Sequence, residues 1–513
     1  MTSEPIAARP EMPTEPARPV RWYNLIAYGS NDVLGAGSMA VISTWILIFY
    51  TSFCGLSAAQ ATIIFGVARV LDAFTSPTIG HLSDGLGRTW LGRKFGRRRF
   101  FILAAIPLLP SFAIMWVAGQ GFWYYLVTYV LFEMVYAMEI IPYETLASEM
   151  ATDYRTKAKF AGARILIGQC AAIAAAFLPG WLISYLGPDS PETYLYMGII
   201  FSIAFMIAAG MLYIFSWERK RPPSLDAKAA ADRPTLGASL KALYGNLFST
   251  LRIRAFRLHL GMYLGGYISQ DIYNAAFTYF VIFALAGSTG IVANLVGVTY
   301  VVQLIAVLIA INFALRLSPS AAYRAAAISF GIGVLLFVAM YGTGYTATAA
   351  VFWVPVLFAG LGRGALNYIP WATYNYMADV DEIVTGQRRE GAFAGVMTFV
   401  RKMSQALAVI LVGQVMQASG FVSKADVQSP TAIAAIVGVL GIGTIVILLF
   451  GIVAASRFRL DPQTHAVLIE EIEHLRDGAR EPTSAANAAI VEDLTGWRYD
   501  ALWGRNPVAG PAR

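Results

Sequence analysis

An ion pair stands inside an apolar stretch near the start of the chain. The segment FGVARVLDAFTSPTIG, residues 65–80, places Arg69 and Asp72 three positions apart. On a helix this spacing puts both side chains on one face. At the centre of a bilayer each charge would cost about 2.5–3.5 kcal/mol on insertion scales. A carboxylate kept at that cost can bind a cation or accept a proton, so the pair indicates ion chemistry if the segment spans a membrane.

Composition and apolar runs predict a membrane protein of the all-α class. The chain has 513 residues, of which 57% are hydrophobic and 13% charged, against about 25% charged in an average soluble domain. A membrane span needs about 20 mostly apolar residues. Twelve candidate spans satisfy this, near residues 25–50, 58–82, 100–118, 122–147, 163–186, 192–216, 257–286, 290–315, 321–343, 349–377, 392–419 and 429–455. We therefore expect a lipid bilayer around most of the chain.

Basic residues in the short links predict the orientation. The link after the second span reads DGLGRTWLGRKFGRRRF, whereas the links on the opposite side hold Lys424 as their one basic residue. Both termini should therefore face the cytoplasm, in a multi-pass protein of the cell membrane, which we take to be a bacterial inner membrane. The net charge of +7 lies largely in cytoplasmic links, so it reflects topology and does not indicate a nucleic-acid partner.

The spans divide the chain into five regions. We expect a disordered, Pro-rich start, a first group of six spans, a basic cytoplasmic link, a second group of six spans, and a cytoplasmic tail in which HAVLIEEIEHLRDG has helical periodicity. Their ranges are 1–21, 22–216, 217–256, 257–455 and 456–513.

Two segments of the two halves repeat each other. IIPYETLASEMA at 140–151 resembles YIPWATYNYMAD at 368–379, and the tripeptide FAG follows each, at 160–162 and 393–395. The fourth and tenth spans thus match. A parallel repeat of two six-helix bundles predicts this correspondence.

Several of these motifs resemble one transporter family. ARVLDAFTSPTIGHLSDGLGR, IIPYETLASEM and ADVDEIVTGQRREGAFAGVMTFVRK are similar to segments of the glycoside–pentoside–hexuronide:cation symporters, the melibiose-permease-like branch of the major facilitator superfamily. The resemblance implies the major facilitator fold, with twelve transmembrane helices in two six-helix bundles around a central cavity. It also implies cation-coupled symport of a sugar, glycoside or oligosaccharide by alternating access. We expect a monomer with a small-molecule substrate and no cofactor other than a coupling ion.

The resemblance also implies a cation site, which this chain only partly keeps. Relatives carry D-x-x-x-D on the second helix; Asp72 matches the first acid, but Ser76 stands at the second. The family's polar or acidic position on the fourth helix falls at Ile140, with Glu139 beside it. With one of three charged ligands in place, we expect H⁺ in preference to Na⁺ as the coupling ion, and no certain metal site. Glu139 or Asp32 would complete a sodium site.

Further intramembrane residues are candidates for substrate binding. Asp32 lies one helical turn before Ala36, the position of a sugar-binding aspartate in relatives, and Arg164 and Lys402 match basic residues of the family. The alternative role of each charged residue, and of Glu133, is a static ion pair. The complete substrate-binding set is Asp32, Tyr143, Arg164, Asp271, Arg363, Trp371 and Lys402.

The cytoplasmic links supply candidates for gating. Glycines there would allow close helix approach, and charge networks that form in one state and break in another would bias the opening. Part of the basic excess is topology signal alone. The gating set is Gly80, Asp84, Gly87 and Arg88 in the first half and Asp379, Asp381, Arg388 and Arg389 in the second.

Other function classes fit less well. Four histidines and two cysteines provide neither a nucleophile–base set nor metal ligands in the spans, so we do not expect an enzyme. No Walker or GxGxxG motif is present, which argues against an ATP-driven pump. A cation-coupled carrier of a lysolipid or other amphipathic solute, and a transporter-like sugar receptor, remain as alternatives.

Overall fold

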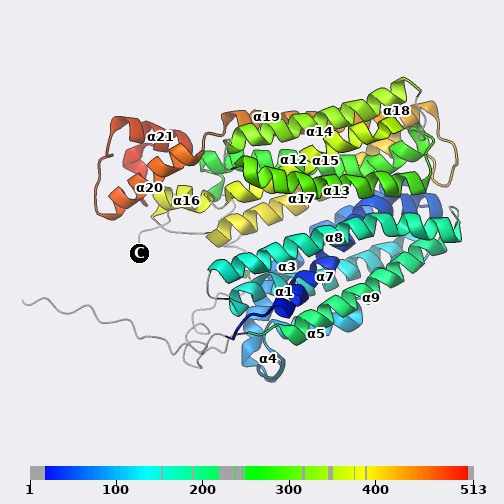
Figure 1. The fold of residues 1–513 in the computed structure, drawn as a ribbon, viewed down its shortest axis with the longest axis horizontal. Helices are drawn as coiled ribbons and strands as arrows, with labels where there is room; N and C mark the ends of the chain where they lie inside the picture. The colour runs from blue at the N-terminus through cyan, green and yellow to red at the C-terminus, as the bar shows by residue number, and fades with distance from the viewer. Residues whose placement is uncertain are drawn as a thin grey trace, which may run out of the picture.

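The chain forms two helical bundles that lie side by side (Figure 1). The computed structural model describes residues 18–151, 154–187, 190–218, 237–238, 245, 249–314, 318–344, 350–374, 376–386 and 390–505. All regular secondary structure within these ranges is helical. The all-α prediction is therefore confirmed.

The first bundle comprises the helices before residue 216. Its first span is a series of short segments, with π-helical turns at Val33–Gly37, Ile42–Ile46 and Phe49–Phe53. The helices are α1 (Trp22–Ser30), α2 (Ser38–Val41), α3 (Ala58–Gly85), α4 (Trp90–Phe95), α5 (Arg99–Ala105), α6 (Ser111–Ile114), α7 (Phe122–Met150), α8 (Tyr154–Leu186) and α9 (Glu192–Phe215). α5 and α6, joined by a 3₁₀ turn, form the third predicted span.

The second bundle repeats this plan after the central link. Its helices are α12 (Arg254–Tyr279), α13 (Thr289–Ala314), α14 (Pro319–Gly342), α15 (Trp353–Tyr374), α17 (Glu390–Ala418), α18 (Pro430–Gly438) and α19 (Thr444–Arg457). In the described part of the chain, eight helices are long and apolar enough to cross a membrane. The other four predicted spans are α1 through the π-helical turn Phe49–Phe53, α5 to α6, α12 and α15, which are shorter, interrupted or more polar.

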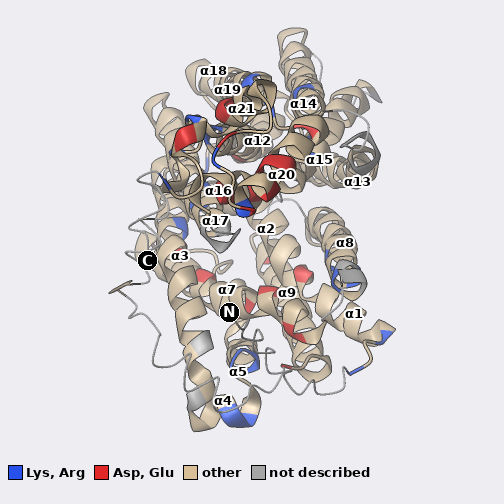
Figure 2. Ribbon diagram, turned by 90° about the vertical axis from the view of Figure 1, so that its left-hand side faces the viewer, with Lys and Arg blue, Asp and Glu red and all other residues tan. Residues whose placement is uncertain are grey.

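Three further helices lie outside the bundles at one end of the molecule, on the left in Figure 1. α16 (Met377–Thr385) connects α15 and α17, and the tail forms α20 (Pro462–Arg476) and α21 (Ala485–Thr495). α20 begins with a capping box in which Asp461 accepts the backbone N–H groups of Gln463 and Thr464, a strong local start signal. The predicted helix in the tail is confirmed, and it packs on α16. Figure 2 views this end along the helix axes, with charged residues on α4, α5, α20 and α21.

The two bundles meet along α3 with α17 and along α8 with α13. Glycines make the first contact close, because a Cβ on Gly413 would lie 1.9 Å from Thr62 Oγ1. Toward the end remote from α20 and α21, Thr51 Oγ1 and Tyr279 OH are 2.9 Å apart, and Ser423 Oγ donates to the carbonyl of Leu56. The halves are thus joined at the end away from the chain termini.

Candidate functional site

One ion pair bridges the two bundles near the middle of the spans. Lys402 on α17 places its ammonium nitrogen 2.7 Å from Asp72 Oδ2 on α3. The same ammonium donates to Ser76 Oγ at 2.7 Å, and Ser76 Oγ donates to Asp72 Oδ1 at 2.9 Å. The Asp72 side chain is 1% exposed and that of Lys402 is 18% exposed. Two residues predicted to bind the cation and one predicted to bind substrate therefore form a single buried triangle.

Arg69 finds its nearer partner on another helix. Its Nη1 lies 3.3 Å from Glu133 Oε2 on α7 and 3.9 Å from Asp72 Oδ2, three residues further along its own helix. All three side chains are no more than 6% exposed. The pair that the sequence singles out is therefore one edge of a four-charge cluster, in which Arg69 and Lys402 compensate Asp72 and Glu133.

Asp32 is held between the first and fifth spans. It immediately precedes the π-helical turn Val33–Gly37, a kind of distortion that recurs at functional sites. Arg164 Nε on α8 donates to both carboxylate oxygens at 3.3 Å. A Cβ on Gly35 would come within 2.5 Å of Oδ1, and one on Gly168 within 2.8 Å of Oδ2. The two glycines leave the space that the carboxylate occupies.

Tyr143 lies beside this pair but is fully buried. The guanidinium of Arg164 is 5.2 Å from the centre of the Tyr143 ring, and the ring of Tyr28 is 4.5 Å away on another helix. Arg164 also donates to Glu144 Oε1 at 3.2 Å. In this conformation Tyr143 packs under the arginine and offers no exposed ring to a sugar.

The second bundle holds its own buried pair. Asp271 on α12 accepts two hydrogen bonds from Arg401 on α17, at 2.6 and 2.9 Å, and a third from Gln405 at 3.1 Å. Arg401 also lies 5.0 Å from the ring centre of Tyr267, whose hydroxyl accepts a hydrogen bond from Trp371 Nε1. The sequence predicts Asp271 and Trp371 as binding residues, whereas Arg401 is revealed only by the structure. The available signal was a second basic residue directly before Lys402.

Arg363 on α15 is buried among neutral groups. Its Nη2 donates to Asn274 Oδ1 at 2.9 Å and its Nε to Gln270 Oε1 at 3.3 Å. The residue is 6% exposed. Among the described residues no carboxylate pairs with it. Arg363 lies inside a span, as the sequence predicts, but the amide side chains around it are revealed only by the structure.

Glu139 is a buried acid that has no basic partner among the described residues. It is completely buried on α7, and neither carboxyl oxygen has a hydrogen-bond partner within the ranges that the structure describes. The equally buried amide of Asn31 adjoins it. In this structure Glu139 therefore makes no contact with Asp72 or Ser76, contrary to the expectation that it would complete a sodium site with them.

A buried histidine links the tenth span to the seventh. Pro370 lies inside α15, and its carbonyl oxygen is 2.8 Å from Nε2 of the completely buried His259 on α12. This contact joins α12 and α15 within the second bundle.

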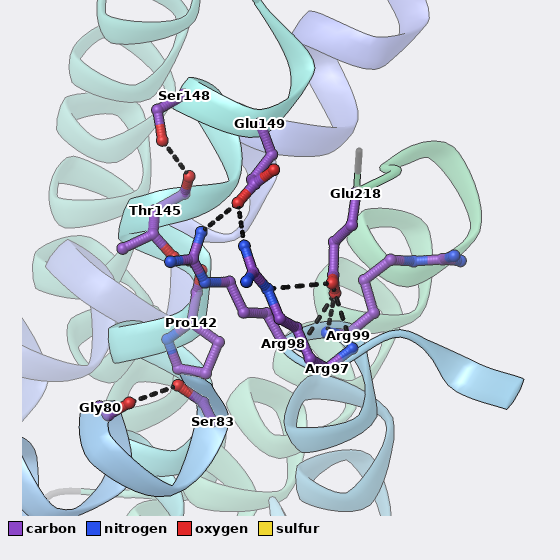
Figure 3. Close-up of polar contacts among 10 residues, drawn as sticks. All are labelled: Gly80, Ser83, Arg97, Arg98, Arg99, Pro142, Thr145, Ser148, Glu149 and Glu218. Carbon is purple, nitrogen blue, oxygen red and sulfur yellow. Dashed lines mark hydrogen bonds and ion pairs between the residues drawn. The ribbon is translucent and has the colours of Figure 1, made fainter. Parts of the chain in front are cut away.

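A charged cluster ties together the ends of three helices in the first bundle (Figure 3). Arg97 and Arg98 reach Glu149, at the end of α7, over 2.5 and 2.8 Å. Glu218, which follows α9, accepts the backbone N–H groups of residues 97, 98 and 99 at 2.7–3.1 Å. A carboxylate at this position satisfies free donors at the N-terminus of α5 and suits the helix dipole. The basic run of the link is thus anchored by two glutamates that the sequence did not single out.

The predicted gating glycines do not bring helices unusually close. A Cβ on Gly80 would lie 3.6 Å from its nearest atom, on Ile141, and one on Gly87 3.7 Å from Arg97, both ordinary contacts. The tight position is Gly92, where a Cβ would lie 2.0 Å from the carbonyl oxygen of Leu86. The side chains of Asp84 and Arg88 fall outside the described part of the chain.

Asp379 of the second gating set and the nearby Glu382 bind the tail. Asp379 Oδ2 lies 2.9 Å from His465 Nε2, and Glu382 Oε1 accepts from Arg476 at 2.6 Å. Asp381 is completely buried. Arg388 and Arg389 lie outside the described residues. The described contacts of Asp379 and Glu382 thus form a docking surface for α20, and a network within the link stays a prediction.

Comparison with known proteins agrees with this architecture. The family described as MFS/sugar transport protein matches residues 27–462. The glucuronide carrier protein homolog of Escherichia coli (strain K12) is 26% identical, over 80% of this chain and 87% of its own. The putative sulfoquinovose importer of Salmonella typhimurium (strain LT2) is 27% identical, over 87% and 91% of the two chains.

A solved structure shares the fold. The D-xylose-proton symporter superposes with a TM-score of 0.55 at 15% identity, over 85% of this chain and 97% of its own. The family match and the relatives confirm the resemblance to the glycoside–pentoside–hexuronide symporters. They also confirm that the chain is related to transporters and not to enzymes. The chain therefore belongs to the MFS/sugar transport protein family, as a multi-pass, all-α membrane protein of the major facilitator fold.

Proposed function

We propose that this protein is a secondary active transporter that couples movement of a cation, a proton in preference to sodium, to symport of a sugar, glycoside or oligosaccharide. The family supports transport of a sugar-type molecule. The assignment of a proton as the coupling ion depends on whether the buried ion pairs form and break when the two bundles move relative to each other.

The contact between Asp72 and Lys402 carries the proposal. Each residue belongs to a different bundle, and their charged atoms are 2.7 Å apart. Protonation of Asp72 would cancel its attraction for the ammonium and loosen the contact between α3 and α17. A ligand that changes the relative free energy of two conformations shifts their populations. Proton binding at Asp72 can therefore be linked to the opening and closing of the transporter.

Proton coupling also agrees with the chemistry of this site. A sodium ion prefers several oxygen ligands, whereas Asp72 is already bonded to an ammonium and to a hydroxyl. A proton requires one carboxylate oxygen and no cage. The nearby Arg69 has Glu133 as its closer partner, which leaves Lys402 as the principal counter-charge of Asp72.

The orientation of the protein completes the proposal. We place the end that carries α4, α16, α20 and α21 in the cytoplasm, because the basic links cluster there and short basic links are retained on that side. With the bundles joined at the opposite end, this conformation faces inward.

The test is uptake into proteoliposomes that contain the purified full-length protein. A panel of radiolabelled mono- and oligosaccharides is offered under an imposed pH gradient, under a sodium gradient, and under neither. We expect accumulation of at least one sugar with the pH gradient alone. Accumulation that requires sodium and survives collapse of the proton gradient would refute proton coupling, and uptake of no sugar under any gradient would refute the sugar assignment.

A further inference from the structure

The basic run that follows α3 contains both paired and unpaired cations. Arg97 and Arg98 bind Glu149. Arg93 and Lys94, a few residues earlier, are exposed, and neither has a carboxylate partner within the ranges that the structure describes. Both belong to α4, the short helix between the second and third spans. These two charges are therefore available to a partner outside the chain.

An exposed indole ring accompanies the two cations. Trp90, the first residue of α4, is 62% exposed. The ammonium nitrogen of Lys94 lies 4.9 Å from the centre of the Trp90 ring and 5.2 Å from that of Phe95, within the range of a cation–π contact. Tryptophan is enriched where a membrane meets water, because its ring is apolar and its N–H is polar. α4 thus combines two free cations with a residue typical of membrane interfaces.

The backbone holds α4 in one orientation. Thr89 caps its start and accepts the backbone N–H of Gly92 at 3.2 Å. Gly96 ends it with a φ of +92°, a conformation that glycine adopts without strain. A Cβ on Gly92 would lie 2.0 Å from the carbonyl oxygen of Leu86, so the glycine allows α4 to fold back on the end of α3. The position of its cations is therefore defined by the local fold.

α4 lies beside the first bundle at the level of a membrane surface. It projects from this bundle on the side away from the second bundle, near the end that carries α20 and α21 (Figures 1 and 2). Only four positions separate Phe95 from Arg99, where the next apolar helix begins, and such a stretch spans at most about 14 Å. The head-group layer extends about 5–8 Å beyond the hydrocarbon core. The outer side of a bundle faces lipid, so α4 adjoins phospholipid head groups.

We propose that α4 is a binding site for an anionic phospholipid of the cytoplasmic leaflet. Arg93 and Lys94 would bind the phosphate, the first through its planar fork of N–H donors and the second as a point charge. The Trp90 ring would lie between the head group and the start of the acyl chains. The lipid then supplies the negative charge that Arg93 and Lys94 lack within the described chain.

Two other roles of these cations make different predictions. Basic links are retained in the cytoplasm when a membrane protein inserts, and cations in the last turn of a helix suit its dipole. Neither role gives the folded protein a preference for one kind of lipid. A site for an anionic phospholipid does, and the preference must depend on Arg93 and Lys94.

The experiment measures which lipid contacts α4. Full-length protein is placed in phosphatidylcholine nanodiscs that contain either photoreactive phosphatidylglycerol or photoreactive phosphatidylcholine. Adducts are mapped to peptides by mass spectrometry, and unlabelled phosphatidylglycerol competes to give an apparent affinity. The bilayer is symmetric and no sugar is present, so the result depends neither on the orientation nor on the transport activity proposed above.

The variants separate charge from aromatic contact. Arg93→Gln/Lys94→Gln removes the two cations, and Trp90→Leu removes the indole. The matched control is Arg480→Gln/Arg498→Gln, which removes two exposed cations from the tail, outside the bundles.

We expect phosphatidylglycerol to label α4 more than phosphatidylcholine does in the native protein and in the tail control. Arg93→Gln/Lys94→Gln should weaken the binding of phosphatidylglycerol about 30-fold, at about 5-fold for each cation near a membrane surface, and leave phosphatidylcholine labelling unchanged. Trp90→Leu should weaken it about 2- to 5-fold. High salt should reduce the preference of the native protein, a measurement that requires no variant.

Three results would overturn the inference. Equal labelling of α4 by the two lipids in the native protein would show that the surface does not select anionic lipid and is free for another class of partner. An undiminished preference in Arg93→Gln/Lys94→Gln would place the phosphate elsewhere. Displacement of the lipid by inorganic phosphate at constant ionic strength would show that the cations bind a free anion and not a phospholipid.

Discussion

Removing Lys402 should destabilise the protein more than removing Lys402 and Asp72 together. At an effective dielectric constant of about 20, charges 2.7 Å apart attract by about 6 kcal/mol and charges 3.9 Å apart by about 4 kcal/mol. The first distance is that of Lys402 from Asp72 and the second that of Arg69 from Asp72. The Asp72 side chain is only 1% exposed. In Lys402→Gln its one remaining counter-charge is therefore the more distant Arg69.

Breaking a buried pair from one side costs about 3–5 kcal/mol. Because Arg69 compensates in part, we expect Lys402→Gln to lower the free energy of unfolding by about 2–3 kcal/mol. In the double variant Asp72→Asn/Lys402→Gln no charge is stranded, and the asparagine amide can still bond Ser76. The expected coupling energy is about 2 kcal/mol.

The assay is a double-mutant cycle on the purified protein in detergent, read by denaturant unfolding. The exposed pair Arg498 and Asp500, whose side chains are 84% and 69% exposed at a separation of 3.2 Å, serves as control and should show coupling of less than about 1 kcal/mol. If the effects of Asp72→Asn and Lys402→Gln simply add, the two charges are not energetically linked, and the proposed role of this contact in joining the bundles is refuted.

Three further outcomes are expected. Asp72→Asn should abolish concentrative uptake but preserve counterflow, because exchange requires no net proton movement; wild-type accumulation by this variant would remove Asp72 from coupling. Gly413→Ala should cost about 1–3 kcal/mol of stability through overpacking, since its Cβ would lie 1.9 Å from Thr62 Oγ1. The control Gly438→Ala should cost little, because no atom lies within 4 Å of the Cβ that it adds. Equal thermal unfolding of the two variants would contradict the close contact of α3 and α17. Burial opposes ionisation of Glu471, but hydrogen bonds from Thr483 and Tyr499 outweigh it and hold the pKa of this carboxyl below its usual value. The ionised carboxylate of Glu471 therefore stabilises the docked tail fully above about pH 4.3, and this stabilisation is lost as the pH falls through the lowered pKa. Pepsin should cleave the tail increasingly as the pH falls below this pKa. In Glu471→Gln this pH dependence should be absent.

The sequence alone determined the class of the protein and most of the charges buried in its spans, although not Arg401. Spans follow from length and hydropathy, which are local properties, and the charged residues within them are visible without any partner. The spacing of Asp72 and Ser76, one helical turn apart, also predicts a shared face, and their 2.9 Å hydrogen bond bears this out.

Only the tertiary structure decided which charges pair. Arg69 lies three residues from Asp72 but is closer to Glu133, and Lys402 reaches Ser76 across 326 positions of sequence. The spacing of residues along one helix contains no information on contacts with residues that are distant in the sequence.

Neighbouring residues show the physical reason most directly. Arg401 and Lys402 are consecutive, yet they point about 100° apart around the helix. Arg401 therefore binds Asp271 within its own bundle, while Lys402 binds Asp72 across the interface. The sequence records two adjacent cations, and the packing of α17 between α12 and α3 gives them different partners. The same packing leaves Arg363 among amides, where no pattern in the sequence marks the missing acid.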